Sequence, residues 1–197
     1  LFASRNVSLT FLDAAQTNSL NSMFIIILAL PISWMWTKLN KHKINPRTPY
    51  KFGFGLLIAG LSFYILALSG SAADQNGMVP FSYLLLMYFL LSIGELFMSP
   101  VGLAKITDLS PQRIVAFMMG VWFLATASSE FIASLLANIA SVDTSNGTAM
   151  DLNIAKQSYL MLFEYLFYTG IGFGIVLLIL SPMIKKLMNG VDKELNN

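Results

Sequence analysis

The sequence predicts an all-α membrane protein that crosses the bilayer five times, and three observations lead to this fold class. Of the 197 residues, 56% are hydrophobic and only 11% are charged, whereas soluble domains carry about 25% charged residues. The mean hydropathy is +0.67. Five stretches each contain the roughly 20 mostly apolar residues that a helix needs to cross the hydrocarbon core of a bilayer.

The five predicted spans are separated by polar connections, and each has its own pattern of charge. The first two have no charged residue, and the third contains a single acid, Glu95. The fourth has Arg113 near its start and Glu130 in its second half, and the fifth has Glu164 near its beginning. In order, the spans cover residues 18–37, 52–73, 80–104, 112–141 and 157–184.

Two local signals refine the last two spans. Ser110 followed by Pro111 is typical of an N-cap and the first position of a helix, so we expect the fourth span to start there. Gly170 and Gly174 are four residues apart, a spacing that is typical of a close contact between two membrane helices. We therefore expect this face of the fifth span to pack against another helix.

The positions of the basic residues predict the orientation of the spans, because Lys and Arg concentrate in cytoplasmic loops. If the connection 38–51 is cytoplasmic, ten of the twelve Lys and Arg residues lie on that side. Only Arg5 and Lys156 lie on the other side. The first residues are then outside and the C-terminus is cytoplasmic, as an odd number of spans requires. We expect the chain to lie in a bacterial inner membrane or a plasma membrane.

The small number of reactive side chains excludes several kinds of site. The chain has no Cys, which removes disulfides, thiolate nucleophiles and Cys-ligated metals. The single His, His42, cannot by itself build a His-based zinc site or a Ser-His-Asp triad. No Asp lies within a predicted span. We therefore expect that the protein is not an enzyme, and that it uses no metal site, organic cofactor or nucleic-acid partner.

Glu95 is the deepest charge in the chain, roughly 15 to 20 Å from either end of its span at 1.5 Å per residue. A charge at that depth costs at least a few kcal/mol, so an intramembrane acid indicates a functional site by default. Ser99 and Leu103 follow on the same helical face. Pro100 has no backbone N–H, so the carbonyl of Leu96 lacks its helical hydrogen bond. Such an unpaired carbonyl in a membrane helix is tolerated mainly beside a cavity or in the protein interior. The alternative is a packing kink with a hydrogen bond from Glu95.

Four further positions are weaker candidates. Asn18 and Asn21 lie three residues apart near the outer end of the first span, where both amides can face one side. Trp122 lies about a third of the way into the fourth span, too deep for the aromatic belt at the membrane surface. Glu130 belongs to the outer half of the same span. Packing, capping or a neighbour's hydrogen bond can also explain each of these residues.

The most distinctive motif surrounds Glu95 and extends into the fourth span. It reads Gly94-Glu-Leu-Phe-Met-Ser-Pro-Val-Gly-Leu and continues through Ser110-Pro111 to Phe117-Met-Met-Gly-Val-Trp-Phe-Leu. This motif resembles the tenth and eleventh helices of the proton-dependent oligopeptide transporters, which belong to the major facilitator superfamily. Residues 18–28 are similar to the eighth helix of that family, and residues 1–7 to the end of its seventh.

The resemblance implies that the chain is the C-terminal half of a twelve-helix transporter, with spans that match helices 8–12 of the major facilitator fold. Residues 1–13 would be the end of helix 7 and an outer connection, and residues 14–197 a helical bundle with a cytoplasmic tail at 185–197. The implied function is proton-coupled uptake of di- and tripeptides by alternating access. The implied partners are these peptides, the lipid bilayer and the N-terminal half of the same transporter, and the proton is the coupling ion.

The resemblance also assigns roles within a peptide site at the midplane between the two halves. Glu95 would receive the amino terminus of the peptide, with Asn21 at the same end and Ser99 as a hydrogen-bonding group. The apolar wall and the cytoplasmic gate would be formed by Leu103, Met119 and Trp122.

Other functions remain open on the sequence alone. One is a different transporter of the same superfamily, for nitrate or another small solute, and the other is a non-transporting membrane subunit in which Glu95 only packs. An anion carrier would need a cation at its site, and the spans contain no Lys or Arg except Arg113 at an edge. Glu130 departs from the family, in which a neutral amide or a small residue is common near that place.

Overall fold

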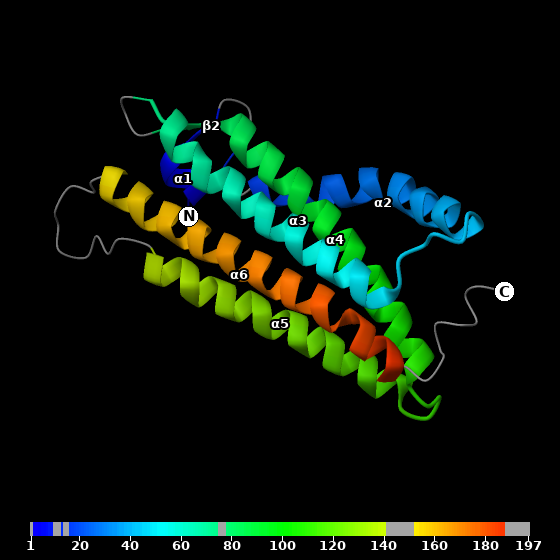
Figure 1. Ribbon diagram of the computed structural model, residues 1–197. Coiled ribbons are helices and arrows are strands. Elements are labelled where there is room, and N and C mark those ends of the chain that lie inside the picture. The colour runs from blue at the N-terminus through cyan, green and yellow to red at the C-terminus, as the bar shows by residue number, and fades with distance from the viewer. Residues whose placement is uncertain (1, 10–12, 14–15, 75–77, 141–151, 188–197) are drawn as a thin grey trace.

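The computed structural model of the protein describes residues 2–9, 13, 16–74, 78–140 and 152–187. Five long helices form most of this part of the chain and pack into one bundle (Figure 1). Each is long and apolar enough to cross a membrane. The predicted fold class, an all-α membrane protein with five spans, is therefore confirmed. The helices are α2 (Thr17–Lys41), α3 (Thr48–Leu68), α4 (Phe81–Leu109), α5 (Val115–Ala140) and α6 (Leu152–Leu187).

The boundary between α4 and α5 differs from the prediction. α4 continues to Leu109, and α5 begins only at Val115. Ser110, with φ −93° and ψ 135°, has extended backbone, as is usual for a residue that precedes a proline. The prediction that Ser110 and Pro111 start a helix is therefore wrong, because Pro111 ends α4 and residues 112–114 form a turn.

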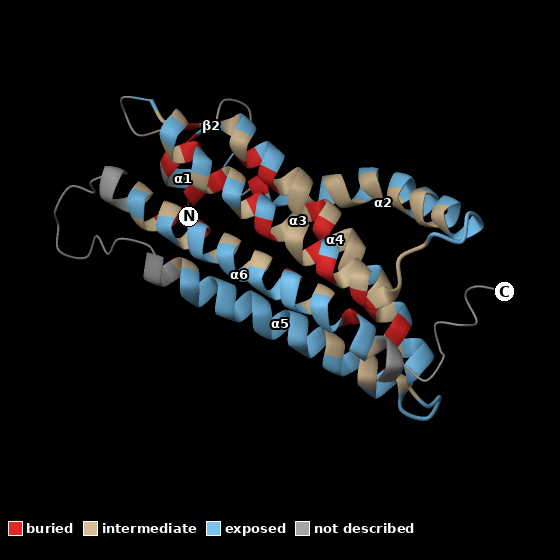
Figure 2. Cartoon of the chain, viewed as in Figure 1, coloured by how far each residue is buried: buried red, intermediate tan, exposed pale blue. Residues whose placement is uncertain are grey.

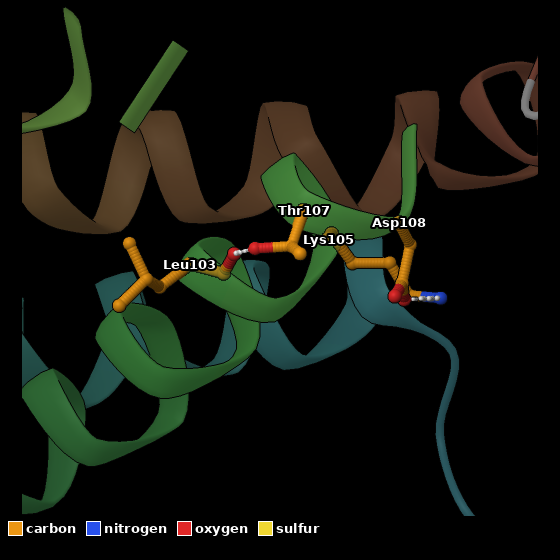
Figure 3. Close-up of polar contacts among 4 residues, drawn as sticks. All are labelled: Leu103, Lys105, Thr107 and Asp108. Carbon is orange, nitrogen blue, oxygen red and sulfur yellow. Dashed lines mark hydrogen bonds and ion pairs between the residues drawn. The ribbon is translucent and has the colours of Figure 1, made fainter. Parts of the chain in front are cut away.

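Polar side chains stabilise the last turns of α4 (Figure 3). The Thr107 hydroxyl donates a hydrogen bond of 3.0 Å to the carbonyl of Leu103. The Lys105 ammonium lies 3.3 Å from the carboxylate of Asp108. Lys105 is only 8% exposed, and a buried charge needs a partner of opposite sign. These contacts favour a helix that extends beyond the predicted end of the span at residue 104.

Short elements connect the start of the chain to one end of the bundle. They are α1 (Phe2–Asn6), β1 (Val7–Ser8), η2 (Ser69–Ala72) and β2 (Val79–Pro80). β1 pairs in parallel with β2, and Val7 lies opposite Val79. The ring of Phe2 meets the edge-on ring of Phe163 in α6 at a centroid distance of 5.1 Å. Most of the fully buried apolar side chains gather at this end, so α1 is part of the core.

α3 is the central helix, and glycines bring it close to α4 and α6. A Cβ atom added to Gly94 of α4 would lie 2.8 Å from the carbonyl oxygen of Gly55 in α3. A Cβ on Gly170 of α6 would lie 2.9 Å from the Cα of Gly60. Gly174 approaches α3 in the same way one turn further along. The expected packing face at Gly170 and Gly174 is therefore confirmed.

Burial decreases from the centre of the bundle towards α2 and α5. Figure 2 shows buried positions along α3 and α4, whereas α5 is exposed over nearly its whole length. Large apolar side chains cover these exposed surfaces, among them Ile26 in α2 at 74% and Phe117 in α5 at 70% exposure. Such surfaces suit contact with lipid tails or with further membrane helices.

Replacing Gly94 by alanine should destabilise the bundle, because the added Cβ would force the backbones of α3 and α4 apart. We expect Gly94→Ala to lower the free energy of unfolding by about 1 to 3 kcal/mol, as overpacking usually does. Gly172→Ala is the matched control, since a Cβ there meets nothing within 4 Å and alanine favours a helix over glycine by up to about 1 kcal/mol. Thermal unfolding in detergent should show a lower midpoint only for Gly94→Ala, and equal midpoints would contradict the packing account.

Candidate functional site

Glu95 meets Asn21 at the contact between α4 and α2. The side-chain nitrogen of Asn21, Nδ2, donates a 3.0 Å hydrogen bond to Oε2 of Glu95. The two residues are 74 positions apart in the sequence, and both belong to helices that can cross a membrane. Among the described residues, none donates a hydrogen bond to the second carboxylate oxygen, Oε1. The structure thus places together the two residues expected to hold the amino end of a peptide.

Ser92 fixes the orientation of the Asn21 amide. The Ser92 hydroxyl lies 2.6 Å from Oδ1 of Asn21 and 2.8 Å from the backbone carbonyl of Tyr88. The amide nitrogen of Asn21 faces Glu95, and a carboxylate oxygen accepts the hydrogen bond that this nitrogen donates. Its amide oxygen is then left to accept from Ser92. Each side of the amide has one partner, and this arrangement holds the Glu95 carboxylate in a defined position.

A further hydrogen bond extends this polar contact along the same two helices. The hydroxyl of Tyr88 donates to Oδ1 of Asn18 at 3.1 Å. Tyr88, Ser92 and Glu95 are spaced by four and three residues, so they share one face of α4. We call the five residues in these two helices the Glu95 network: Asn18, Asn21, Tyr88, Ser92 and Glu95. Tyr88 and Ser92 were not predicted as part of the site, although their spacing from Glu95 is visible in the sequence.

Ser99 and Leu103 lie on α4 beyond Glu95 and outside this network. Ser99 is exposed, and its hydroxyl makes no hydrogen bond to another described residue. Leu103 is half-buried, and its carbonyl accepts the Thr107 hydroxyl (Figure 3). α4 continues as one helix through Pro100. The polar contacts of Glu95 therefore extend towards Tyr88, and the expected role of Ser99 as a hydrogen-bonding group for a peptide stays a prediction.

Trp122 of α5 packs against α4 on the side that carries Glu95. A Cβ on Gly102 would lie 2.5 Å from the indole ring of Trp122 and 2.9 Å from the ring of Phe52. Gly102 follows Glu95 by seven residues, so it lies on the same side of α4 about 10 Å further along the axis. Met119, one turn before Trp122, is half-buried. An apolar surface thus begins two turns from the carboxylate.

Glu130 lies on an exposed part of α5 and takes no part in the Glu95 network. The hydroxyls near it bond to the backbone of their own helix; Thr126, for example, donates to the carbonyl of Phe123 at 2.8 Å. Within the described residues, no group of three or more His, Asp or Glu side chains is arranged to hold a metal ion.

A cavity of about 440 Å³ lies beside the network, at the end of the bundle that contains α1. Asn18 and Tyr88 form part of its wall. The rest is mainly apolar and includes Phe2, Leu66 and Phe163. Glu95 and the expected wall residue Trp122 do not line it. The cavity is therefore distinct from the surface between Glu95 and Trp122.

Known proteins resemble most of the chain. The sequence profile of the POT family matches residues 1–158. The uncharacterized transporter YclF of Bacillus subtilis (strain 168) is 34% identical over 180 residues, which are 91% of this chain and 33% of YclF. Dipeptide and tripeptide permease A of Serratia proteamaculans (strain 568) is 34% identical over 190 residues, which are 94% of this chain and 36% of the permease.

The fold is also similar to that of solved transporters. A crystal structure of the peptide transporter POT in complex with sulfate superposes with a TM-score of 0.76 and 35% sequence identity, covering 95% of this chain and 35% of that one. The chain spans about a third of the length of the curated relatives it matches. It is an integral membrane protein with several spans, and it belongs to the POT family.

Proposed function

We propose that this chain supplies the C-terminal half of a proton-coupled transporter that takes up di- and tripeptides by alternating access. Membership of the POT family and the likeness to dipeptide and tripeptide permeases support the proposal. The observation that carries it is the bond between Asn21 and Glu95, because it holds a carboxylate between two membrane helices with one oxygen directed to no described donor. The N-terminal half of the transporter completes the site.

The Glu95 carboxylate binds the ammonium group of the peptide. Asn21 donates to Oε2, so Oε1 takes the charge-assisted hydrogen bond from the ligand. The amide of Asn21 keeps this position because Ser92 bonds its other end. Ser99 lies one turn along α4 and is exposed, so its hydroxyl serves the peptide backbone.

The protonation state of Glu95 is linked to peptide binding. An ionised Glu95 attracts an ammonium group, whereas a protonated Glu95 does not, so a proton and a peptide exclude each other at this carboxylate. The proton that enters with the peptide therefore binds another carboxylate of the complete transporter, and its binding shifts the balance between the states of the transporter. The proton is the coupling ion, and no cofactor takes part.

Side chains of different peptides meet the apolar surface formed by Trp122, Met119 and Leu103. Met adapts its shape to many partners, and the indole offers a large flat surface. Specificity then depends on the two ends of the peptide backbone rather than on its side chains. The absence of Lys and Arg from the Glu95 network is unfavourable for an anion such as nitrate at this site.

The proposed orientation places the connection between α2 and α3 in the cytoplasm and η2 outside. His42 and Ser71 are exposed at these opposite ends of the bundle, and the chain has no Cys of its own. In intact cells, a membrane-impermeant thiol reagent should label Ser71→Cys, but it should label His42→Cys only after the membrane is permeabilised. If only His42→Cys is labelled in intact cells, the orientation is the opposite of the one proposed.

Glu95→Gln should abolish or severely weaken proton-driven uptake of dialanine. The glutamine still accepts the Asn21 hydrogen bond, so folding should be preserved, but the ammonium group loses its counter-ion. Loss of such a pair usually costs 2 to 5 kcal/mol, or roughly 30-fold or more in affinity. The loss of transport is measured by the uptake of labelled dialanine. The loss of the counter-ion is measured by comparing the affinities for dialanine and N-acetyl-dialanine, and the affinity for the blocked peptide should fall less.

The matched control is Glu164→Gln, which removes one acid from an exposed position of α6 and should keep uptake near the wild-type rate. If Glu95→Gln transports dialanine at the wild-type rate, or distinguishes free from blocked amino ends as well as wild type does, Glu95 is a packing residue.

Trp122→Ala should weaken the binding of peptides with large apolar side chains by about 1 to 3 kcal/mol, the usual value of burying such a group. Dialanine should lose much less, because its side chains do not reach the indole. Phe123→Ala is the control, since Phe123 is the next residue and is 57% exposed. Binding titrations with dialanine and diphenylalanine test this, and equal losses for both peptides would mean that Trp122 only supports the fold.

A further inference from the structure

The turn that joins α2 to α3 concentrates positive charge at one end of the bundle. No acidic residue occurs in the sequence from Ala14 to Ala73. The first three basic residues of the turn are exposed and the last two are half-buried. We call these five residues the basic turn: Lys38, Lys41, Lys43, Arg47 and Lys51. The turn thus has five positive charges and no carboxylate of its own.

Two tryptophans hold cations of the basic turn at defined places. The ammonium of Lys51, at the start of α3, lies 4.3 Å from the ring centroid of Trp36 in α2. The ammonium of Lys38 lies 5.0 Å from the ring centroid of Trp34. Both distances are within the range of cation–π attraction. The contact between Lys51 and Trp36 also joins the two helices, so the charges of both converge on one surface.

The indole of Trp34 places this surface at the boundary of the membrane. Trp34 is 65% exposed, and it lies near the end of a helix that can cross a bilayer. Amphipathic rings favour the headgroup level, where one part of the ring is apolar and another is hydrated. The exposed ring beside Lys38 therefore presents both an apolar surface and a positive charge to the headgroup region.

Lys43 occupies a backbone position that normally favours glycine. Its φ angle is 57°, and the backbone N–H of Ile44 bonds the carbonyl of Leu39 at 3.1 Å. This is the closing turn of a helix, in which glycine is the usual residue at the left-handed position. A lysine there keeps a positive charge in an ordered turn although glycine would fit the backbone better.

We propose that the basic turn binds the headgroups of anionic phospholipids, such as phosphatidylglycerol, in the cytoplasmic leaflet. Clusters of four to eight Lys and Arg directly beside a membrane helix attract anionic lipids. The position of Trp34 at the membrane boundary favours a lipid headgroup over a soluble phosphate. The proposal depends on the proposed orientation of the chain, but it is independent of peptide transport.

The test measures which lipids surround the basic turn in the complete transporter. A donor dye on Asn40→Cys, in a cysteine-free background, reports energy transfer to vesicles that contain acceptor-labelled phosphatidylglycerol or phosphatidylcholine. Transfer to phosphatidylglycerol should exceed transfer to phosphatidylcholine. Replacing Lys41 and Lys43 by glutamine should raise the phosphatidylglycerol fraction needed for half-maximal transfer by about fivefold for each lysine.

Two further variants separate charge at this site from net charge and from stability. Arg113→Gln combined with Lys156→Gln also removes two positive charges, but at positions outside the basic turn, and should leave the energy transfer unchanged. Lys43→Gly should raise the thermal midpoint, because it relieves the left-handed backbone, and should still weaken lipid enrichment. The proposal would be overturned if both double variants lost the enrichment of phosphatidylglycerol to the same extent. It would also be overturned if the variant with Lys41→Gln and Lys43→Gln kept the full enrichment of phosphatidylglycerol.

A competition arm distinguishes the lipid from a soluble anion. Glycerol phosphate at millimolar concentration should leave the energy transfer nearly unchanged, because it cannot insert into the bilayer beside Trp34. If it removes the enrichment, the turn is a site for soluble phosphate compounds and the lipid proposal is wrong. None of these measurements includes a peptide, so their failure would not affect the proposed transport function.

Discussion

The close contact between α3 and α4 sets the direction of Glu95. Gly94 approaches the backbone of Gly55 so closely that a Cβ atom would lie 2.8 Å from its carbonyl oxygen. Glu95 is the next residue, about 100° further around the helix. With Gly94 facing α3, the carboxylate turns away from that interface and meets Asn21 on α2. Neighbouring residues of one helix thus provide the packing and the chemistry.

The remaining helices are attached to this centre by different kinds of contact. α6 packs on α3 through glycines, α2 joins α4 through the Glu95 network, and α5 places Trp122 over Gly102. α2 and α5 leave most of their surface exposed. In the proposed transporter the N-terminal half packs and rocks against part of these surfaces as the site opens to one side and then to the other.

Some of this arrangement was predictable from the sequence, because the bilayer restricts what a span can contain. Length and apolarity gave the five spans, and depth in the membrane singled out Glu95. Hydrogen-bond partners were harder to predict. Hydroxyls in spans commonly bond their own helix, as Ser62 does with the carbonyl of Ala59, so the position of Ser92 did not reveal its contact with Asn21. Ser92 and Ser99 are seven residues apart and lie on one side of α4, so their different contacts depend on where Asn21 of α2 lies along the axis of α4.

The most direct test of the central claim is a structure of the complete transporter with dialanine bound. The account predicts that the peptide nitrogen lies about 2.8 Å from Oε1 of Glu95, the usual length of a charge-assisted hydrogen bond, while Asn21 still donates to Oε2. A peptide whose amino group lies away from Glu95, with Glu95 bonded only to Asn21, would contradict the claim.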